Sequence, residues 1–495
     1  MSPLTLVVGS GNAGLTMAIL LARSGRRVCL LECQSSIGGY LRRFTRRGMR
    51  FDTGFHFAGG FNSCLPQMLQ VLGFEGMPAV MPLVNRVHLA PSNRTFELPN
   101  SGIDDMETCL KELFPADADA IGKYYQTEKQ IVKETPMFDL HDDYEKFRAQ
   151  LSPYDSITLQ EFLDELRLKS PELPALLGQM ALCHGSLPKE TPMSHHCRVS
   201  HGLNDSLRRF EHGGDVILKK MKEILAELGI RVATSAKLVE LADFNNANHC
   251  CTAILSTGES LSIQEIYFAT HPDVFVPLLP KRLLTPSFQR RLRRNRDSCS
   301  FFSLYGELHS PAIPSNSLTQ IVSSLDLNRV LSPEFPDYAT AVINTNEADL
   351  SGIMRRNVTA FRTMSLSEIL TQTEMKSPND KRTDKYHDFK RSQAEDILSD
   401  VNAAYPGSLE ELEVFASATP LTCAKYSPPR GSAYGVRRQL TTTRVFGRLP
   451  VGNCFALGHN ALLPGFLGTM MGAFILFRTV LGEEPYQKLL KEAKL

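Results

Sequence analysis

The apolar and polar positions along the chain divide it into segments of alternating strand and helix character. Leu4–Val8 is a continuous apolar run, Leu15–Ala22 has the composition of a helix core, and Val28–Leu31 is a second apolar run. Two short apolar runs joined by a helix are typical of a βαβ unit, whose strands must lie parallel in one sheet. The first sixty residues therefore predict a strand, a tight turn, a helix and a second strand.

The same α/β character returns twice further along the chain. Val216–Leu228 predicts a helix, and short buried strands are expected at Ile230–Ala233, Lys237–Leu241 and Ile266–Ala269. It resumes after Gly407 and continues to the C-terminus. Since these segments are discontinuous, the material between them must form a second domain that is inserted twice into the first.

The intervening segments differ from one another in pattern. Ile103–Leu177 mixes charged and apolar residues at helical spacing and is expected to be mostly helical. Glu374–Ser392 is strongly polar with little apolar spacing, so a solvated helix or loop is expected there.

The charges nearly cancel, with 54 basic and 53 acidic residues. No global field therefore recruits nucleic acid, and any electrostatic partner must be recognised locally. Eleven cysteines are scattered, odd in number and without a CxxC pair. This pattern favours free thiols in a reducing, cytoplasmic compartment over an extracellular disulfide framework.

An apolar stretch from Cys454 to Leu481 has enough residues to span a bilayer. His459, Asn460, Pro464 and several glycines interrupt it, and polar groups are costly in lipid. A buried helix beside a cofactor is therefore expected here instead of a transmembrane helix.

A glycine-rich turn follows the first predicted strand and opens the first predicted helix. It has the sequence Gly9-Ser10-Gly11-Asn12-Ala13-Gly14. The first glycine permits the tight turn, the second allows the backbone to approach a pyrophosphate, and the third allows helix and strand to pack closely. Phosphates would then meet free N–H groups at the positive end of the helix. Gly9, Gly11, Asn12, Ala13 and Gly14 are therefore predicted to contact a dinucleotide; the alternative is a glycine turn in an unrelated α/β protein.

Glu32 ends the second predicted strand, where an acidic side chain accepts hydrogen bonds from a ribose. A carboxylate at this position suits an unphosphorylated ribose, because it would repel a 2′-phosphate. Gly38 and Gly39 follow, then Tyr40-Leu41 and the stretch Phe51–His56. A simple NAD site does not need this extension, whereas the flavin half of FAD needs additional glycine backbone. FAD is the predicted cofactor, with Gly38, Gly39 and Leu41 among its contacts.

These motifs resemble the phytoene desaturase and retinol saturase superfamily of FAD-dependent oxidoreductases, and the likeness continues at intervals over nearly the whole chain. Gly213-Gly214 and the helix after it are similar to the superfamily's second contribution to the FAD domain. In that pattern, a backbone group at Leu238 meets the adenine. The stretches Leu182–Pro188 and Pro429–Gly435 look closer to the retinol saturase branch.

The strongest likeness after the N-terminus lies near the C-terminus. Phe455–Asn460 resembles a strand that ends in a glycine turn, and Leu463–Thr469 opens an apolar helix. Gly458 permits backbone contact with ribityl or phosphate oxygens, and His459 is expected to touch the cofactor. The start of the helix, at Leu467, Gly468 and Thr469, can present N–H groups to the flavin ring. The triplet Gly458-His459-Asn460 departs from the Gly-Gln-Asp that is more usual in the retinol saturase branch, which weakens any transfer of substrate identity.

The expected fold class is α/β, with a two-part Rossmann-type FAD-binding domain and a discontinuous α+β substrate domain. We assign residues 1–75, 205–275 and 410–495 to the FAD-binding domain. Residues 76–204 and 276–409 are assigned to the substrate domain, which has a helical portion.

Two side chains are candidates for acid–base chemistry. A flavin carries the hydride itself, so few indispensable side chains are expected. His56 follows the Asp-Thr-Gly stretch and could donate a proton at the flavin cavity, or it could be packed for structure. Tyr434 lies just before the C-terminal flavin segment and could donate a proton to a carbanion-like carbon, or simply pack.

A metal site is not expected. His195-His196-Cys197, with Cys183 and His184 nearby, offers ligand types. However, adjacent histidines project in different directions, and no paired spacing of a zinc site is present.

The segment Phe288–Arg296 is rich in arginine and follows the apolar cluster Val274–Leu284. A basic helix beside an apolar one can rest on an anionic membrane surface, which would suit an enzyme that draws its substrate from lipid. The alternative is a solvated helix face. Peripheral membrane contact is therefore one expectation for the partners of this chain.

The resemblance implies oxidation or reduction of carbon–carbon double bonds in a lipophilic polyene, such as a carotenoid or retinoid, by hydride transfer at flavin N5. The alternatives are a redox-neutral double-bond isomerase, an FAD-dependent amine oxidase and a non-catalytic flavin-binding lipid carrier. No second dinucleotide site is evident in the sequence. A quinone, oxygen or a separate reductase is therefore expected as electron partner.

Overall fold

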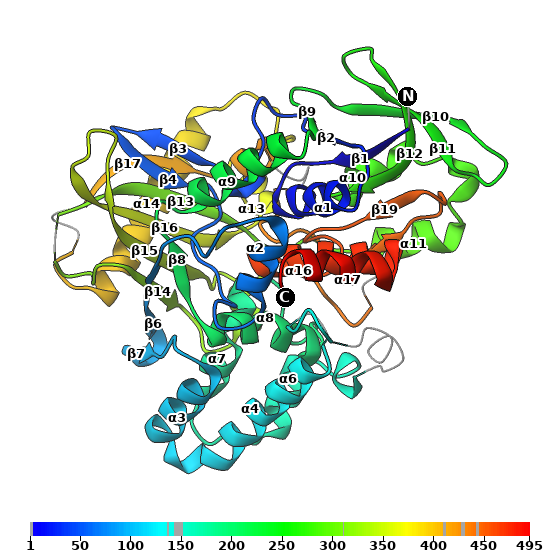
Figure 1. Ribbon diagram of the computed structural model, residues 1–495. Helices are drawn as coiled ribbons and strands as arrows, with labels where there is room; N and C mark the ends of the chain where they lie inside the picture. Colours follow the sequence, from blue (N-terminus) through cyan, green and yellow to red (C-terminus); the bar gives the residue numbers. More distant parts are fainter. Residues whose placement is uncertain are drawn as a thin grey trace.

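The computed structural model describes residues 3–135, 138–142, 152–309, 311–408, 412–426, 431–441 and 445–495. Its first sheet has eight strands, with β10, β11, β12, β1, β2 and β9 in that order and with β19 and β18 joined to β12 (Figure 1). These strands are β1 (Leu4–Val8), β2 (Val28–Leu31), β9 (Arg231–Ala233), β10 (Leu238–Phe244), β11 (Cys250–Leu255), β12 (Ser260–Phe268), β18 (Gly447–Arg448) and β19 (Cys454–Ala456).

The central strands of this sheet are parallel. Val8 of β1 lies opposite Leu31 of β2 and Phe268 of β12, and Phe268 lies opposite Ala456 of β19. The carboxyl ends of strands from the start, middle and end of the chain therefore meet at one edge, which is where open α/β sheets bind ligands.

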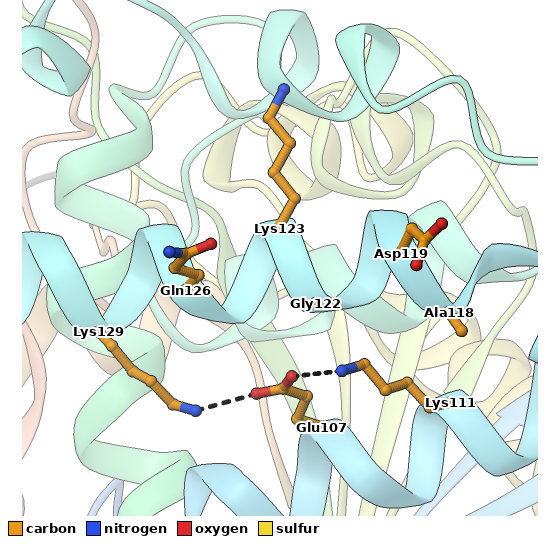
Figure 2. Close-up of a pocket in the computed structure, with 8 residues that line it drawn as sticks. All are labelled: Glu107, Lys111, Ala118, Asp119, Gly122, Lys123, Gln126 and Lys129. Atoms are coloured by element: carbon orange, nitrogen blue, oxygen red, sulfur yellow. Dashed lines mark hydrogen bonds and ion pairs between the residues drawn. The ribbon is translucent and has the colours of Figure 1, made fainter.

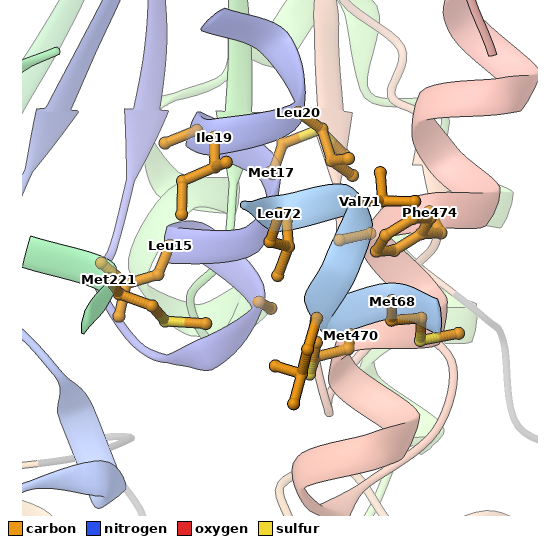
Figure 3. Packing of buried hydrophobic residues seen from close by; sticks show 14 of the residues in the cluster. Leu15, Met17, Ile19, Leu20, Met68, Val71, Leu72, Met221, Met470 and Phe474 are labelled. Atoms are coloured by element: carbon orange, nitrogen blue, oxygen red, sulfur yellow. The ribbon is translucent and has the colours of Figure 1, made fainter. Parts of the chain in front are cut away.

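One face of the first sheet is covered by helices from distant parts of the sequence. They are α1 (Asn12–Arg23), α2 (Cys64–Leu72), α9 (Gly214–Glu227), α16 (Gly465–Leu481) and α17 (Glu483–Glu492). Residues 13–21 of α1 are all buried, because α1 lies between the sheet and α2 and α16. Figure 3 shows this packing, in which Leu20 and Met17 of α1 face Val71 and Phe474. A helix enclosed in this way needs no polar face.

The second sheet has seven strands in the order β17, β13, β16, β15, β14, β6, β7. Neighbours are antiparallel except β14 and β6. The strands are β6 (Val84–Leu89), β7 (Arg94–Leu98), β13 (Ser300–Leu308), β14 (Ser317–Val322), β15 (Ala339–Ala348), β16 (Met354–Met364) and β17 (Leu412–Ala418). Two further pairs of antiparallel strands lie outside both sheets: the hairpin of β3 (Arg43–Arg46) and β4 (Met49–Asp52), and the pair β5 (Val80–Pro82) with β8 (Arg208–Phe210).

A helical portion packs below the second sheet in Figure 1 and shares an apolar core with β6, β7 and the ends of β14 and β15. It contains α3 (Ile103–Leu113), α4 (Ala118–Lys133), α6 (Leu159–Glu165), α7 (Leu173–Gly178) and α8 (Met193–Asp205). The helical character expected over Ile103–Leu177 is therefore confirmed for its described part. The helices elsewhere are α10 (Pro272–Phe275), α11 (Pro286–Arg294), α12 (Leu327–Leu331), α13 (Leu366–Gln372), α14 (Asp384–Ala404) and α15 (Pro420–Tyr426).

The predicted elements of the first sheet are confirmed at β1, α1, β2, α9, β9 and β10. Glu374–Ser392 contains the first part of α14, which runs on to Ala404 because Ile397 and Val401 bury an apolar side against the second sheet. The division into two domains stays a prediction. Within it, β17 pairs with β13 in the second sheet, although residues 410–495 were assigned to the FAD-binding domain.

The apolar stretch near the C-terminus consists of β19, a turn and α16. Among the residues that the structure describes, no helix is both long and apolar enough to cross a membrane.

Candidate dinucleotide and substrate site

The predicted glycine turn joins β1 to α1 with almost no free space inside it. Gly9 has a φ of +98°, and a Cβ there would lie 2.8 Å from the carbonyl oxygen of Ala269. A Cβ on Gly14 would lie 1.8 Å from the carbonyl oxygen of Gly9, which no side chain can tolerate. Gly11 differs, because a Cβ there would meet nothing within 4 Å. The turn is therefore closed towards the sheet and open at Gly11, as approach of a phosphate to the backbone requires.

Glu32 lies directly after β2 and is held by the glycine turn. Its Oε2 accepts hydrogen bonds from the backbone N–H (3.1 Å) and the hydroxyl (2.5 Å) of Ser10, and its Oε1 accepts from the N–H of Gln34 (2.8 Å). The carboxylate is buried next to the turn, as predicted. A ribose hydroxyl would compete with the Ser10 hydroxyl for Oε2, a feature that the sequence pattern did not reveal.

Gly38 and Gly39 form a second turn against the first. Their φ values are +121° and +53°, and a Cβ on Gly39 would lie 3.0 Å from the Cα of Gly11. The N–H of Gly38 donates to the carbonyl oxygen of Ser10 at 3.0 Å. Leu41 follows in a 3-10 turn. Its carbonyl oxygen would lie 2.1 Å from a Cβ on Gly214, at the start of α9. Three glycine segments that are distant in the sequence therefore meet here.

The C-terminal segment reaches the same place. Gly458 follows β19 with a φ of +95°, and Ala13 of α1 is the residue that a Cβ there would approach, at 3.5 Å. The side-chain amide of Asn12 donates to the carbonyl oxygen of Phe466 (2.8 Å) and to the hydroxyl of Thr469 (2.9 Å) in the first turn of α16. The first turns of α1 and α16 are therefore joined by a side chain.

The start of α16 is tightly fitted. The Leu467 side chain packs against Gly60 and Gly202, where added Cβ atoms would lie 2.6 and 2.9 Å from it. A Cβ on Gly468 would lie 2.7 Å from that of Leu463. Because the first N–H groups of a helix have no partner within it, this turn retains donors for a ligand.

Three buried polar atoms around these turns have no hydrogen-bond partner in the described part of the chain. They are Asn12 Oδ1, Thr270 Oγ1 and His459 Nε2. Thr270 contacts Gly9, since a Cβ on Gly9 would lie 2.8 Å from its methyl group. Burial, followed by the charge of His271, lowers the pKa of His459 to about 4, so its imidazole is neutral at pH 7. Buried polar groups are normally paired, so these three atoms fit a site for a polar ligand.

Leu238 begins β10 on the outer edge of the first sheet and pairs with Leu255. It follows Ala236, whose N–H donates to the carbonyl oxygen of Glu32 at 3.0 Å. Leu238 is therefore two residues from a direct contact to Glu32. Its contact with an adenine stays a prediction.

His56 lies on the other side of these turns, facing the second sheet. Its Nδ1 is 3.5 Å from Asp52 Oδ2, and its ring stacks on Phe361 of β16 with centroids 5.0 Å apart and 15° between planes. Burial alone would raise the pKa of Asp52, but the charges of Arg209 and Arg43 and the hydrogen bond from His56 hold that pKa well below its usual range. Asp52 is thus ionised, and its carboxylate lies within ion-pair distance of one ring nitrogen of His56.

Tyr434 lies against both the C-terminal segment and the second sheet. The next residue, Gly435, contacts the ring of His459 so closely that a Cβ would lie 2.3 Å from its Cδ2. The Tyr434 ring meets Phe301 of β13 edge-on at 6.0 Å, and Phe301 meets Phe361 at 5.0 Å. Burial, with smaller contributions from Cys183 and Cys299, raises the pKa of Tyr434 well above its usual value, so its phenol keeps its proton.

The two candidate catalytic residues are therefore joined by a continuous row of rings, His56, Phe361, Phe301 and Tyr434, across strands β16 and β13. We call these four residues the ring row. The place of Phe301 and Phe361 in this row could not be predicted from the sequence, because neither residue lies in a motif. Asp52 could have been found, since it lies four residues before His56 in the Asp-Thr-Gly stretch.

Buried charges connect the β3–β4 hairpin to the second sheet. Arg43 Nε lies 2.9 Å from Asp52 Oδ1, and Arg43 also pairs with Glu347 of β15 at 2.5 Å. Arg209 pairs with Asp52 and lies 3.8 Å from Glu347. Since removing one member would leave a buried charge uncompensated, this four-residue network fixes the position of Asp52.

The histidines considered for a metal bond to one another instead. The Ser186 N–H donates to His184 Nδ1 (3.3 Å), so the neutral ring of His184 carries its proton on Nε2 and donates to His196 Nδ1 (3.1 Å). His196 Nε2 then donates to the Tyr124 hydroxyl (3.0 Å), which donates to the carbonyl oxygen of Leu177 (2.9 Å). Elsewhere, ligand atoms of Glu307, His309 and Glu413 lie within 4.8 Å of one another, but Arg355 and Arg47 already pair with the two carboxylates.

A hollow of about 470 Å³ lies between α3 and α4, far from the glycine turns (Figure 2). Glu107 crosses it with ion pairs to Lys111 (2.6 Å) and Lys129 (2.9 Å). Its lining is charged and polar, so it does not fit an apolar substrate.

Pro429 and Arg430 of the predicted approach to the flavin segment lie outside the described residues.

Comparisons with known proteins agree with this arrangement. Residues 7–72 match the NAD(P)-binding Rossmann-like domain family. All-trans-retinol 13,14-reductase of Danio rerio is 25% identical over 99% of this chain and 88% of its own length. The 4,4'-diapolycopene oxygenase of Methylomonas sp is 24% identical over 61% of this chain and 62% of its own length. These similarities support the resemblance to the phytoene desaturase and retinol saturase superfamily.

Solved structures show the same fold. An oxidoreductase from Methanosarcina mazei superposes with a TM-score of 0.66 and 13% identity over 96% of this chain and 99% of its own. Putrescine oxidase bound to putrescine gives a TM-score of 0.62 and 12% identity over 97% and 98%. The predicted fold class is thus confirmed: the first sheet belongs to a Rossmann-like domain, and a second, mixed sheet accompanies it.

The close approach at Gly14 predicts a sharp contrast between two helix glycines. Gly14→Ala should lower the free energy of unfolding by about 3 kcal/mol or more, because the added methyl group would displace the Gly9 carbonyl. Gly472→Ala in α16 should change it by less than about 1 kcal/mol, since its nearest neighbour would be 3.8 Å away. Urea unfolding measures both. Equal effects of the two substitutions would contradict the described turn.

The buried histidine chain predicts a loss of stability in mild acid. Burial lowers the pKa of His184 well below 6.5 and that of His196 to about 4. As pH falls below 6.5, the unfolded chain takes up protons that the folded protein does not, so the free energy of unfolding falls until about pH 4. For His196, the fall between pH 7.5 and pH 5 should be roughly 2 kcal/mol.

Urea unfolding at the two pH values tests this. His196→Gln keeps a donor and an acceptor but no longer titrates, so its stability should depend less on pH. His387→Gln is the control, because His387 is exposed and lies outside the chain of histidines, so the dependence should stay close to that of the wild type. A His196→Gln variant as pH-dependent as wild type would show that the chain of histidines is not as described.

Proposed function

We propose that this chain is an FAD-dependent oxidoreductase that adds or removes hydrogen across a carbon–carbon double bond of a long lipophilic polyene, such as a carotenoid or retinoid. Similarity to the superfamily and the names of the relatives support an oxidoreductase acting on such bonds. The observation that carries the proposal is the convergence of the glycine turns, the C-terminal segment and the ring row. A dinucleotide bound at these turns would lie beside an aromatic surface.

The residues around the turns fit FAD. Gly9, Gly11 and the start of α1 would receive the pyrophosphate, and Glu32 would receive the adenosine ribose after the Ser10 hydroxyl turns away. Gly38, Gly39, Leu41 and Leu238 would complete the adenosine and pyrophosphate side. The unpaired atoms of Asn12, Thr270 and His459 would find partners in the cofactor. Ala13 and Gly14, in the first turn of α1, belong to the pyrophosphate side. On the flavin side we propose Gly458, Leu467, Gly468 and Thr469.

Bound FAD would supply the hydride acceptor or donor, with a proton exchanged at the neighbouring carbon of the double bond. The ring row would hold the polyene, since flat apolar chains pack well against aromatic faces and edges. His56, whose Nδ1 lies 3.5 Å from Asp52, would hold or deliver a proton from its other ring nitrogen. Tyr434, a phenol that keeps its proton, is the second candidate donor.

Amine oxidases have the same fold, but the charges near the ring row do not favour an amine. The ionised Asp52 is already paired with Arg209 and Arg43, so it offers no free negative charge to a cationic substrate. The polyene is therefore the better-supported substrate class.

The proposed reaction needs an electron partner and access to an apolar substrate. The electron partner would be a quinone, oxygen or a separate reductase. All eleven cysteines are free, which supports a reducing, cytoplasmic location. Peripheral contact with a membrane would give access to an insoluble substrate. At α11, the arginine side is exposed while Phe288 and Leu292 pack against the core, so contact there would be electrostatic.

The activity is tested anaerobically with chemically reduced protein. All-trans-retinol, a carotenoid and an unsaturated fatty acid are added one at a time, and flavin absorption and product mass are followed. Reoxidation of the flavin with a mass gain of two hydrogens is expected for a reductase. The oxidised protein with the same panel tests the desaturase direction. A shift of the polyene absorption with the flavin still reduced would indicate the isomerase instead.

The acid–base assignment predicts a selective loss of rate. His56→Gln or Tyr434→Phe should lower the rate of flavin reoxidation by about 100-fold if that residue donates the proton, without loss of bound FAD. His212→Gln and Tyr426→Phe are exposed controls that should react at the wild-type rate. Wild-type rates in both His56→Gln and Tyr434→Phe would leave the proton donor outside the ring row.

A further inference from the structure

The tip of the β15–β16 hairpin exposes three large apolar side chains. Leu350 is 68% exposed, Ile353 60% and Met354 65%, more than any other large hydrophobic residue in the described part of the chain. Scattered single apolar residues are normal on a surface, whereas a contiguous group marks contact with another apolar phase. These three residues, called the apolar tip below, lie within five positions of one hairpin.

The apolar tip is held in a defined conformation. The N–H of Asp349 donates to the carbonyl oxygen of Ile353 (2.9 Å), and the Asp349 carboxylate accepts from the backbone N–H groups of Ser351 (2.8 Å) and Ile353 (3.1 Å). The N–H of Leu350 donates to the carbonyl oxygen of Gly48 at 2.9 Å, in the turn of the β3–β4 hairpin. Two hairpins therefore support one another, and the exposed side chains are presented on a fixed backbone.

The charges around the apolar tip nearly cancel. Arg46 and Arg47 lie in the adjoining β3–β4 turn and are exposed, and Arg47 pairs with Glu413. Arg355 pairs with both Glu307 and Asp349. The tip therefore offers exposed hydrocarbon without a large net charge, so its attraction to lipid would come from its apolar side chains.

We propose that the apolar tip inserts into the surface of a lipid bilayer, with the exposed Arg46 at the level of the headgroups. Three side chains on a narrow hairpin offer far less than the roughly 800 Å² per partner of a standard protein interface. A second copy of this chain or another protein therefore fits the tip less well than lipid does. This proposal assigns the membrane contact of the proposed function to one surface, the apolar tip. It rests on the proposed function only for the reason why the chain would bind a membrane.

The apolar tip and α11 are separate surfaces. In Figure 1, β3 and β4 lie on the left of the molecule and α11 on the right. The two contacts also differ in their physics: α11 offers cations with its apolar residues turned inward, whereas the tip offers hydrocarbon. Binding through α11 would vanish at high salt, whereas binding through the tip would be weakened but retained.

Tryptophan can report on the tip directly, because the chain contains none. Ile353→Trp should show a blue-shifted emission on addition of phosphatidylcholine–phosphatidylglycerol vesicles, and quenching when the lipid chains are brominated. Val239→Trp is the matched control, since Val239 of β10 is 44% exposed on the other sheet. A blue shift in Ile353→Trp alone supports insertion. No shift, or the same shift in both variants, overturns it, as does a shift that follows protein concentration without vesicles.

A second variant locates the binding energy. Replacing Leu350, Ile353 and Met354 together by Ser should lower the partition into the vesicles by at least about 100-fold, because each buried apolar side chain contributes about a tenfold factor. Replacing Arg290, Arg291, Arg293 and Arg294 of α11 by Gln should have a much smaller effect. The reverse order would assign the contact to α11 and overturn the proposal.

Failure of the tip and failure of the proposed function can be told apart. Visible flavin absorption and turnover of detergent-dispersed polyene should be unchanged in the triple Ser variant, while turnover of vesicle-embedded polyene should fall. Vesicle binding by a wild-type protein that lacks flavin and turnover would uphold the tip and refute the function.

Discussion

The contact between backbone and backbone at Gly9 and Gly14 is the constraint on which the rest of the site depends. Helix α1 can start directly above β1 only because neither position carries a side chain. That start places Asn12 where its amide reaches the first turn of α16, from the other end of the chain. Gly11, by contrast, faces open space, which leaves room for a phosphate beside the backbone.

The second requirement is a fixed relation between the two sheets. The network of Arg43, Asp52, Arg209 and Glu347 joins the β3–β4 hairpin to β15 through buried, mutually compensated charges. Such a network contributes little net stability compared with apolar packing, but it strongly disfavours arrangements that leave one charge unpaired. Because Asp52 lies 3.5 Å from Nδ1 of His56, and His56 stacks on Phe361, the network adjoins one end of the ring row.

Much of the first sheet was predictable, because it consists of local patterns. Apolar runs predicted β1 and β2, and the glycine spacing predicted the turn whose geometry the structure confirms at Gly9 and Gly14. The second sheet was not predictable in detail, since its order depends on pairings such as β14 with β6, which are distant in sequence. Phe301 and Phe361 have no local signal, and their role follows only from the meeting of β13 and β16. The Ser10 hydroxyl on Glu32 was also unforeseen, because a motif gives residue types and not hydrogen bonds.

The central claim is that the two ends of the chain build one FAD site, and the bound cofactor tests it most directly. The protein is purified, its visible spectrum recorded, and the ligand released by denaturation is identified by mass and counted per chain. The two-banded absorption of oxidised flavin and one FAD per chain are expected for the wild type. Asn12→Ala should bind FAD more weakly. A colourless protein that takes up no FAD on incubation, or one that binds NAD in its place, would contradict it.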